Sequence, residues 1–385
     1  MAYSTKLKYG INPHNGNASM RMSKKGYPIE ILNGNPGTVN LLEALRGIGL
    51  VAEIDKTFDM PAAAALKHKN AAGAAIGLPL DDVYKNIYFC ADKKLTQLAA
   101  AYLRAEGTDP KSAYGGTTCL SRTIDVPTAL EMKKRVIDVV VAPGYEPEAL
   151  EILKKKKESR MVIIQYDPKY ELPPQHTINE GDVEFTFDRD NYKVTNELLE
   201  DVVGAPLTEN ETRDLKLGAV IAKYTKSNKT IYTIDGQTAG VMPGQMSRVD
   251  SIRWAGEKSI MWLLRQSEEV QNIKPIADKL SKSMYDKIQL QTQIVETFLN
   301  GKTKTEKRVM IKDVMENRKW DSFRATTCGF LPFVDNITEA YNNCVGSILY
   351  PKAPSKGIRF PEISEEAKKV GIKLCLFPYR LFRED

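Results

Sequence analysis

The stretch that decides the fold class is Ile137-Asp-Val-Val-Val-Ala-Pro143-Gly144, which is typical of a buried strand ending in a turn. An amphipathic segment at 146–157 follows and predicts a helix. The next apolar run, Arg160-Met-Val-Ile-Ile-Gln165, predicts a second strand. Together they form a β-α-β pattern, and the same alternation upstream predicts a three-layer α/β domain.

Upstream of this unit, Ile29-Glu-Ile-Leu32 predicts a short strand, and Asn33–Gly37 predicts the turn after it. Thr38 is a plausible N-cap for the helix that follows. The expected buried face of that helix comprises Val39, Leu42, Leu45 and Ile48.

The whole chain is expected to divide into two α/β subdomains, 1–195 and 196–385. Residues 167–192 are Pro-rich and polar, so they predict a linker or a surface excursion. Residues 266–319 are charged and helical in pattern, which predicts an inserted helical arm with an apolar seam. No repeat is obvious, although both halves alternate strands and helices. The expected seam comprises Ile276, Leu280, Met284, Ile288, Ile294 and Phe298.

Length and composition describe a globular protein, because 385 residues with 42% hydrophobic and 27% charged content can build two or three cores. No apolar run is long enough to span a bilayer, so no membrane partner is expected. The N-terminal residues lack the apolar region of a signal peptide, and a cytoplasmic location is the expectation.

The cysteines and the charge exclude further classes of protein. Five cysteines without a C-x-x-C pair argue against a disulfide framework and a structural zinc, so no metal is expected. The net charge of +6 is dispersed, which disfavours nucleic-acid binding and suits a small anionic substrate.

A candidate for catalysis lies in Pro61-Ala-Ala-Ala-Ala-Leu-Lys67-His68-Lys69-Asn70-Ala-Ala-Gly73-Ala-Ala, which holds one of only three histidines. The Lys67-His68 step puts a cation beside a side chain that can accept and return a proton near neutral pH. The alternative is a plain strand-to-turn corner, and the dipeptide alone favours that alternative. The rest of the chain decides between the two.

Nine collinear segments carry a resemblance to a known family. The chain resembles the formyltransferase domain of the bifunctional purine-biosynthesis enzyme, which is 5-aminoimidazole-4-carboxamide ribotide (AICAR) transformylase. The segments are LKYGINPHN (7–15), ILNGNPGTVNLLEAL (31–45), PAAAALKHKNAAGAA (61–75), VPTA (126–129), VVVAPGYEPEAL (139–150), IAKYTKSN (221–228), PGQMSR (243–248), LPFVDN (331–336) and YRLF (379–382).

The resemblance implies two subdomains related to the cytidine deaminase fold, in an intertwined homodimer with active sites at the subunit interface. It implies no catalytic metal, in line with the cysteine pattern. The chain opens on the formyltransferase portion, so the family's cyclohydrolase activity is not expected here. The implied reaction transfers the formyl group of 10-formyltetrahydrofolate to the 5-amine of AICAR, giving FAICAR and tetrahydrofolate.

This acyl transfer needs a group that moves a proton from the attacking nitrogen to the leaving nitrogen, and a donor facing the developing oxyanion. By the resemblance, His68 is the proton acceptor and Lys67 stabilises the oxyanion. Asn228 matches a catalytic asparagine, whose amide can both donate and accept and so orient the substrate. Taken alone, Asn228 would more simply be a turn residue.

The resemblance also implies binding roles. The ribotide contacts are expected at Lys8, Tyr9, Gly115, Asp138, Arg248 and Arg380. The folate contacts are expected at Val249, Phe330, Asp335, Pro354 and Ser355. Asp138 lies in a strand that looks buried, where a carboxylate needs a partner. Taken alone, Phe330 would be a core aromatic and Arg380 a frayed terminal charge.

Several positions depart from the family pattern: Lys8 replaces an arginine, Asn15 a glutamine, Asn70-Ala71 a Ser-Pro, Lys111 a methionine, Gly116 an aspartate and Val334 an arginine. These departures lie around the expected catalytic trio. They leave open a divergent paralogue acting on another aminoimidazole ribotide, and a non-catalytic ribotide-binding protein. Lys67, His68 and Asn228 together favour the enzyme, since a pure binder needs no proton shuttle.

Overall fold

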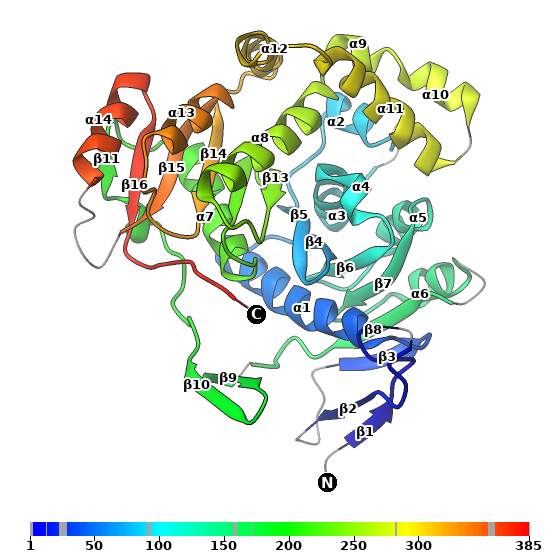
Figure 1. Ribbon diagram of the computed structural model, residues 1–385. Helices are drawn as coiled ribbons and strands as arrows, with labels where there is room; N and C mark the ends of the chain where they lie inside the picture. The colour runs from blue at the N-terminus through cyan, green and yellow to red at the C-terminus, as the bar shows by residue number, and fades with distance from the viewer. Residues whose placement is uncertain are drawn as a thin grey trace.

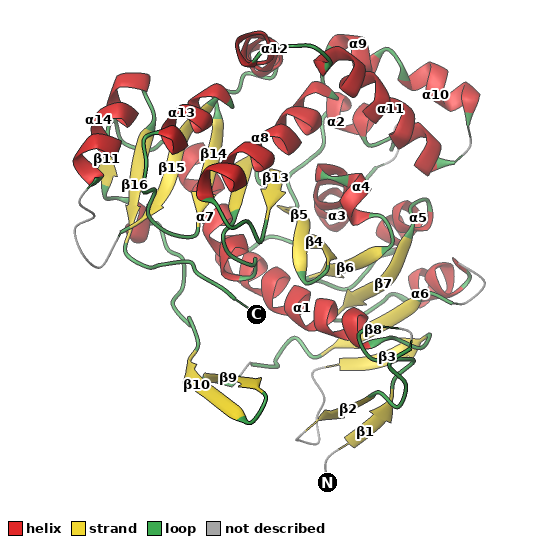
Figure 2. Cartoon of the chain, in the orientation of Figure 1, coloured by secondary structure: helices red, strands yellow, loops and turns green. Residues whose placement is uncertain are grey.

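The computed structural model describes residues 3–12, 14–22, 29–90, 94–156, 160–171, 173–281, 283–352 and 359–384 (Figure 1). Within these ranges, a mixed sheet of 12 strands runs through the molecule, and helices cover both of its faces (Figure 2). The α/β class predicted from the sequence is therefore confirmed.

The first half of the chain fills one half of this sheet. Its strands are β3 (Ile29–Asn33), β4 (Ala62–Lys67), β5 (Asn70–Ile76), β6 (Gly116–Leu120), β7 (Ile137–Ala142) and β8 (Val162–Tyr166). Its helices are α1 (Thr38–Phe58), α2 (Asp82–Ile87), α3 (Gln97–Thr108), α4 (Pro110–Ala113), α5 (Val126–Lys133) and α6 (Pro147–Lys154). Strands β7 and β8 pair in parallel across α6, as the β-α-β pattern predicts.

The second half of the chain fills the rest of the sheet. Its strands are β11 (Val202–Val203), β12 (Thr230–Ile234), β13 (Gln237–Met242), β14 (Phe323–Thr327), β15 (Val345–Pro351) and β16 (Lys373–Phe377). A 3₁₀ turn, η2 (Glu197–Leu199), precedes them. Its helices are α7 (Glu209–Lys223), α8 (Arg248–Leu264), α9 (Glu268–Gln271), α10 (Lys274–Leu280), α11 (Met284–Leu299), α12 (Lys304–Asn317), α13 (Asp335–Asn342) and α14 (Phe360–Val370).

The two halves repeat one topology, which the sequence does not reveal by eye. From the middle outward, the strand order is β5-β4-β6-β7-β8-β3 in one half and β13-β12-β14-β15-β16-β11 in the other. Each half therefore has a central hairpin, three parallel strands and an antiparallel edge strand. The halves join where β5 pairs antiparallel with β13, Ala75 facing Gln237. We retain the division near residue 195 as a proposal, because the strands before and after it fill separate halves.

Helices α1 and α7 pack on one face of the sheet, and α3, α5, α6, α8, α13 and α14 pack on the other. Alanines let the layers approach closely: Ala62 and Ala64 face α1, while Ala63 faces the other layer. Two glycines extend this close contact. A Cβ on Gly73 would lie 2.1 Å from the Ala105 carbonyl oxygen of α3, and one on Gly47 would lie 2.3 Å from Cys119 Sγ.

The expected buried face of α1 is right at Ile48, which is buried, and wrong at Leu42 and Leu45. Leu42 and Leu45 are each 38% exposed, while the sheet covers Leu41, Glu43 and Ala44. The buried stripe is turned about the helix axis relative to the expected one. Helix α1 packs on the sheet through small residues and one buried carboxylate. The full buried stripe is Leu41, Glu43, Ala44, Gly47, Ile48, Leu50, Val51 and Ile54.

The other sequence predictions for segments outside the sheet meet mixed outcomes. The sequence allowed a linker or a surface excursion at 167–192, and residues 167–171 and 173–192 form a surface excursion. It contains the separate hairpin of β9 (Gln175–Glu180) and β10 (Val183–Asp188). A second small hairpin pairs β1 (Tyr3–Lys6) with β2 (Ser19–Met22). The expected helical arm is α9 to α12, but Ile276 and Leu280 of its seam are exposed because they lie on its outer helix, α10.

Candidate functional site

The turn that carries His68 joins β4 to β5, which are middle strands of the sheet. It lies at an edge formed by the ends of the strands, not by an outer strand. His68 and Lys69 both adopt left-handed backbone conformations, with φ of 52° and 66°. Such conformations suit a two-residue hairpin turn but cost conformational energy for residues other than glycine. Two contacts hold the turn: Asn70 Nδ2 donates to the His68 carbonyl oxygen at 3.0 Å, and the His68 N–H donates to Glu43 Oε1 at 2.5 Å. The His68 side chain is exposed.

The Lys67 ammonium is anchored beside this turn. Its Nζ donates to the carbonyl oxygens of Tyr114 and Gly115, each at 3.0 Å. An ammonium carries three N–H donors, so a third remains for a ligand. Gly115 has a φ of +64°, and a Cβ placed on it would lie 3.5 Å from Asp138 Oδ2 and 3.7 Å from Lys67 Nζ. The structure therefore brings Lys67, Gly115 and Asp138 together.

Asp138 corrects one expectation from the sequence. Its side chain is exposed, although the other five residues of β7 are buried. Asp138 is the second residue of the strand and lies at the edge of the sheet, where β6 and β7 begin beside the end of β4. The Asp138 side chain therefore lies at the surface, beside Gly115 and Lys67.

The turn that carries Asn228 comes from the second half of the chain and begins β12. Asn228 exchanges two backbone hydrogen bonds with Gln245, at 3.1 and 2.9 Å. Its side-chain Nδ2 donates to the Met246 carbonyl oxygen at 3.1 Å, and its Oδ1 accepts from Cys328 Sγ at 3.4 Å. One N–H and one lone pair of the amide are left for a substrate.

Asn70 joins the two turns. Its Oδ1 accepts a hydrogen bond from the Lys226 N–H at 2.9 Å, two residues before Asn228. The register agrees, since the turn after β4 and the start of β12 lie at the same edge of the sheet. The first and second halves of the chain thus contribute neighbouring parts of one site.

Arg248 and Phe330 form the next part of this edge. Arg248 begins α8, its Nη1 donates to the Phe330 carbonyl oxygen, and its guanidinium lies 5.1 Å from the centre of the Phe330 ring. Arg248 Nε is buried and has no hydrogen-bond partner among the described residues. Phe330 is 39% exposed, so it is not the core aromatic that it would be if taken alone. Val249, the next residue of α8, is half-buried.

The other expected binding residues lie around this edge. Among the described residues, the structure records no contact between them and the His68 turn. Asp335 is exposed at the start of α13 and accepts from Asn336 Nδ2 at 2.8 Å. Lys8 and Tyr9 lie against the start of α1, where the Tyr9 carbonyl oxygen accepts from the Thr38 N–H at 3.3 Å. Arg380 is exposed, and its guanidinium lies 4.1 Å from the Phe382 ring centre. Pro354 and Ser355 lie outside the described residues.

The C-terminal segment packs against the Asn228 turn, and a buried lysine, Lys229, contacts both. Lys229 Nζ donates to the Thr225 carbonyl oxygen at 2.7 Å and to the Leu381 carbonyl oxygen. Burial lowers the Lys229 pKa from its ordinary 10.5 to about 7, and nearby Arg383 acts in the same direction. The Leu381 N–H also donates to the Cys328 carbonyl oxygen at 3.1 Å, so the C-terminal segment fixes the turn that holds Asn228.

Sequence reasoning missed Glu43, Asn70 as a connector, and Lys229. Glu43 could have been found as a carboxylate inside a helix stripe of small and apolar residues. Asn70 and Lys229 show their roles only once distant segments are brought together. Among the described residues, no cluster of His, Cys, Asp and Glu could hold a metal ion, and no helix is long and apolar enough to cross a bilayer.

A family model described as the AICARFT/IMPCHase bienzyme matches residues 1–258. The chain belongs to this family. Among its relatives is the bifunctional purine biosynthesis protein PurH of Thermoanaerobacter sp. strain X514, which is 34% identical over 265 residues, covering 66% of this chain and 46% of the relative. PurH of Agrobacterium fabrum strain C58 is 34% identical over 260 residues, covering 66% of this chain and 44% of the relative. The chain thus spans less than half the length of these relatives.

Proposed function

We propose that the chain is an AICAR transformylase, which moves the formyl group of 10-formyltetrahydrofolate to the 5-amine of AICAR and so serves purine biosynthesis. Membership in the family supports the reaction class. The observation that carries the proposal is the hydrogen bond from Lys226 to Asn70, because it joins the turn of His68 to the turn of Asn228. Residues of the two expected catalytic segments can then act on one substrate.

In the proposed reaction, His68 accepts the proton that the attacking amine loses and returns it to the leaving nitrogen. Its exposed position in a turn held by two hydrogen bonds suits this role. Lys67 stabilises the negative charge that develops on the formyl oxygen, using the donor that its two carbonyl contacts leave available. Asn228 orients the carboxamide and the amine through its remaining donor and acceptor.

Binding of the ribotide is proposed for Lys8, Tyr9, Gly115, Asp138, Arg248 and Arg380. Asp138 is accessible and suits the ribose hydroxyls, while Gly115 permits a close backbone approach. Lys8 offers a point charge to the phosphate, and Arg380 can bind it through two donors at once.

The residues at the Phe330 end of the edge fit a folate. The exposed ring of Phe330 offers a flat surface for the pteridine or the benzoyl group. Phe330, Val249 and Asp335 are the described residues proposed for this role. The folate supplies the formyl group when bound.

A homodimer with its active sites at the subunit interface is part of the proposal. Val183, Phe185 and Phe187 of β10 are about half exposed and belong to a hairpin outside the main sheet. An isolated two-stranded hairpin is marginally stable in water, so a second copy that covers it would stabilise it. Sedimentation equilibrium measures the mass in solution, and a monomer at micromolar concentration would contradict this part.

The test of the proposed function follows tetrahydrofolate release by absorbance with purified protein, AICAR and 10-formyltetrahydrofolate. A signal that requires all three components supports the proposal. A flat trace from folded protein contradicts it and favours a related ribotide or a non-catalytic role. Binding of AICAR measured by calorimetry then separates those two alternatives.

A further inference from the structure

Glu43 is a buried carboxylate in an unusual position. It is 3% exposed and lies on the face of α1 that packs against the sheet. Its Oε1 accepts from the His68 N–H at 2.5 Å, and its Oε2 accepts from Thr117 Oγ1 at 2.6 Å. Among the described residues, Glu43 forms no ion pair. Burying a carboxylate without a cation costs folding free energy, so packing alone does not explain why a glutamate occupies this position.

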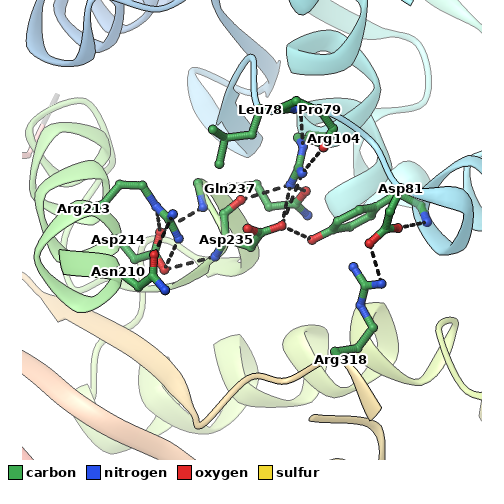
Figure 3. Close-up of polar contacts among 12 residues, drawn as sticks. Leu78, Pro79, Asp81, Arg104, Asn210, Arg213, Asp214, Asp235, Gln237 and Arg318 are labelled. Atoms are coloured by element: carbon green, nitrogen blue, oxygen red, sulfur yellow. Dashed lines mark hydrogen bonds and ion pairs between the residues drawn. The ribbon is translucent and has the colours of Figure 1, made fainter. Parts of the chain in front are cut away.

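The same arrangement occurs a second time, in the other half of the chain. Asp214 lies on α7, which precedes β12 as α1 precedes β4. Its two carboxylate oxygens accept from the Asp235 N–H at 3.0 Å and the Gly236 N–H at 2.8 Å (Figure 3). Asp235 and Gly236 form the turn between β12 and β13, with φ of 51° and 71°, close to the values of the His68 turn. Each half thus anchors a left-handed hairpin turn on a helix carboxylate.

The two copies differ in their surroundings. Asp214 is paired with Arg213 at 2.9 Å, and the turn residue Asp235 is paired with the buried Arg104 at 3.2 Å (Figure 3). The Asp214 turn lies at the opposite edge of the sheet, because β5 and β13 run antiparallel. Among the residues that the structure describes, Glu43 instead accepts only from neutral donors, at the edge that carries Lys67 and Asn228. Both halves therefore share a helix carboxylate that holds a hairpin turn. Of these two arrangements, only that of Glu43 lies at the candidate active site.

We propose that Glu43 is the positioning residue of His68: it holds the left-handed turn that presents the imidazole, by accepting from the His68 N–H. Thr117 holds the carboxylate in place from β6. This inference rests on the proposed formyl transfer, in which His68 moves the proton. The role is geometric, so it needs an acceptor at this position and does not need a charge.

Three substitutions of Glu43 and one of Asp214 test this role. Glu43→Gln keeps an acceptor for the His68 N–H and can donate to Thr117 Oγ1, so kcat stays within about threefold of wild type. Glu43→Leu removes the acceptor while filling the space, and Glu43→Ala removes it and leaves a cavity. In both, kcat falls by about a hundredfold with little change in KM for AICAR, as expected for a misplaced catalytic group. Asp214→Ala is the matched control: it lowers the melting temperature and leaves kcat near that of wild type.

A second readout does not depend on activity. With ¹⁵N-labelled histidine, the three histidines give three backbone amide signals. The His68 signal exchanges slowly with solvent in wild type, Glu43→Gln and Asp214→Ala, and rapidly in Glu43→Leu. Inactive wild type with this exchange pattern would contradict the proposed function and leave the anchoring role intact. Folded Glu43→Leu with wild-type kcat, or with slow His68 exchange, would overturn the positioning role, as would an equal loss of kcat in Asp214→Ala.

Discussion

Asn70 Oδ1 accepts a hydrogen bond from the Lys226 N–H at 2.9 Å, across the junction of the two halves of the sheet. The same side chain donates through Nδ2 to the His68 carbonyl oxygen at 3.0 Å. One amide therefore ties the turn of the proposed proton acceptor to the turn of Asn228. The relative position of His68 and Asn228 depends on this contact.

Replacing Asn70 tests that dependence. Asn70→Ala removes both hydrogen bonds, and we expect kcat to fall about tenfold because the two turns lose their fixed relation. Loss of stability should be limited to about 1 kcal/mol per hydrogen bond in urea unfolding. Asn70→Asp is the control, since it keeps an acceptor for Lys226, loses the donor to His68 and adds a negative charge. Equal kcat values for Asn70→Ala and wild type would show that the two turns act independently.

Lys67 is expected to matter for the rate more than for binding. Lys67→Met removes the ammonium and keeps the apolar stem, so kcat should fall by about 100- to 1,000-fold if the group stabilises an oxyanion. The measurement is the steady-state rate at saturating AICAR and folate. Because the ammonium also holds two carbonyl oxygens, thermal unfolding should be measured alongside. A rise in KM with kcat unchanged would assign Lys67 to ground-state binding instead.

Lys229 predicts a specific pH dependence of stability. Its pKa is about 7 in the folded chain and near 10.5 when unfolded, so the unfolded state binds more protons between these values. Its contribution therefore makes the free energy of unfolding rise with pH above 7, by at most about 1.4 kcal/mol per pH unit. Urea unfolding of wild type and Lys229→Met between pH 7 and 9 measures this. The free energy of unfolding of wild type minus that of Lys229→Met should increase with pH. Parallel curves of this free energy against pH would contradict the lowered pKa.

Arg104 tests the opposite edge of the sheet. Its side chain is 2% exposed and donates to Asp235, Gln237 and the carbonyl oxygens of Leu78 and Pro79, which links the two halves (Figure 3). Arg104→Met should destabilise the fold by about 3–5 kcal/mol, because it leaves Asp235 without its ion-pair partner. The exposed pair Lys352–Asp201 is the control, where Lys352→Met should cost less than about 1 kcal/mol. Equal losses in denaturant unfolding would contradict the role of Arg104.

The sequence predicts the local elements of this fold well where a pattern is complete. The β-α-β unit over 137–165 needs only an apolar run, an amphipathic run and another apolar run, and β7, α6 and β8 form there. The joining of both halves in one sheet was not predicted, because it depends on a pairing between β5 and β13 that leaves no local pattern.

The candidate site was predictable only in part. Lys67, His68 and Asn228 were identified by the resemblance, and the structure brings their two turns together through Asn70. Glu43 was missed because the spacing of Leu42 and Leu45 suggested another helix face, and those leucines are exposed. Asp138 was expected to be buried because its strand is apolar, but its position at the sheet edge exposes it. Contacts between distant segments decide all of these outcomes.

We propose that this chain formylates AICAR with His68 as the proton acceptor. Mass spectrometry of the ribotide after incubation with 10-formyltetrahydrofolate tests it most directly, with wild type and folded His68→Ala compared at equal concentration. We expect wild type to convert AICAR to a product heavier by one formyl group in place of one hydrogen, and His68→Ala to yield almost none. Full conversion by His68→Ala, or no formylated product from wild type, would contradict it.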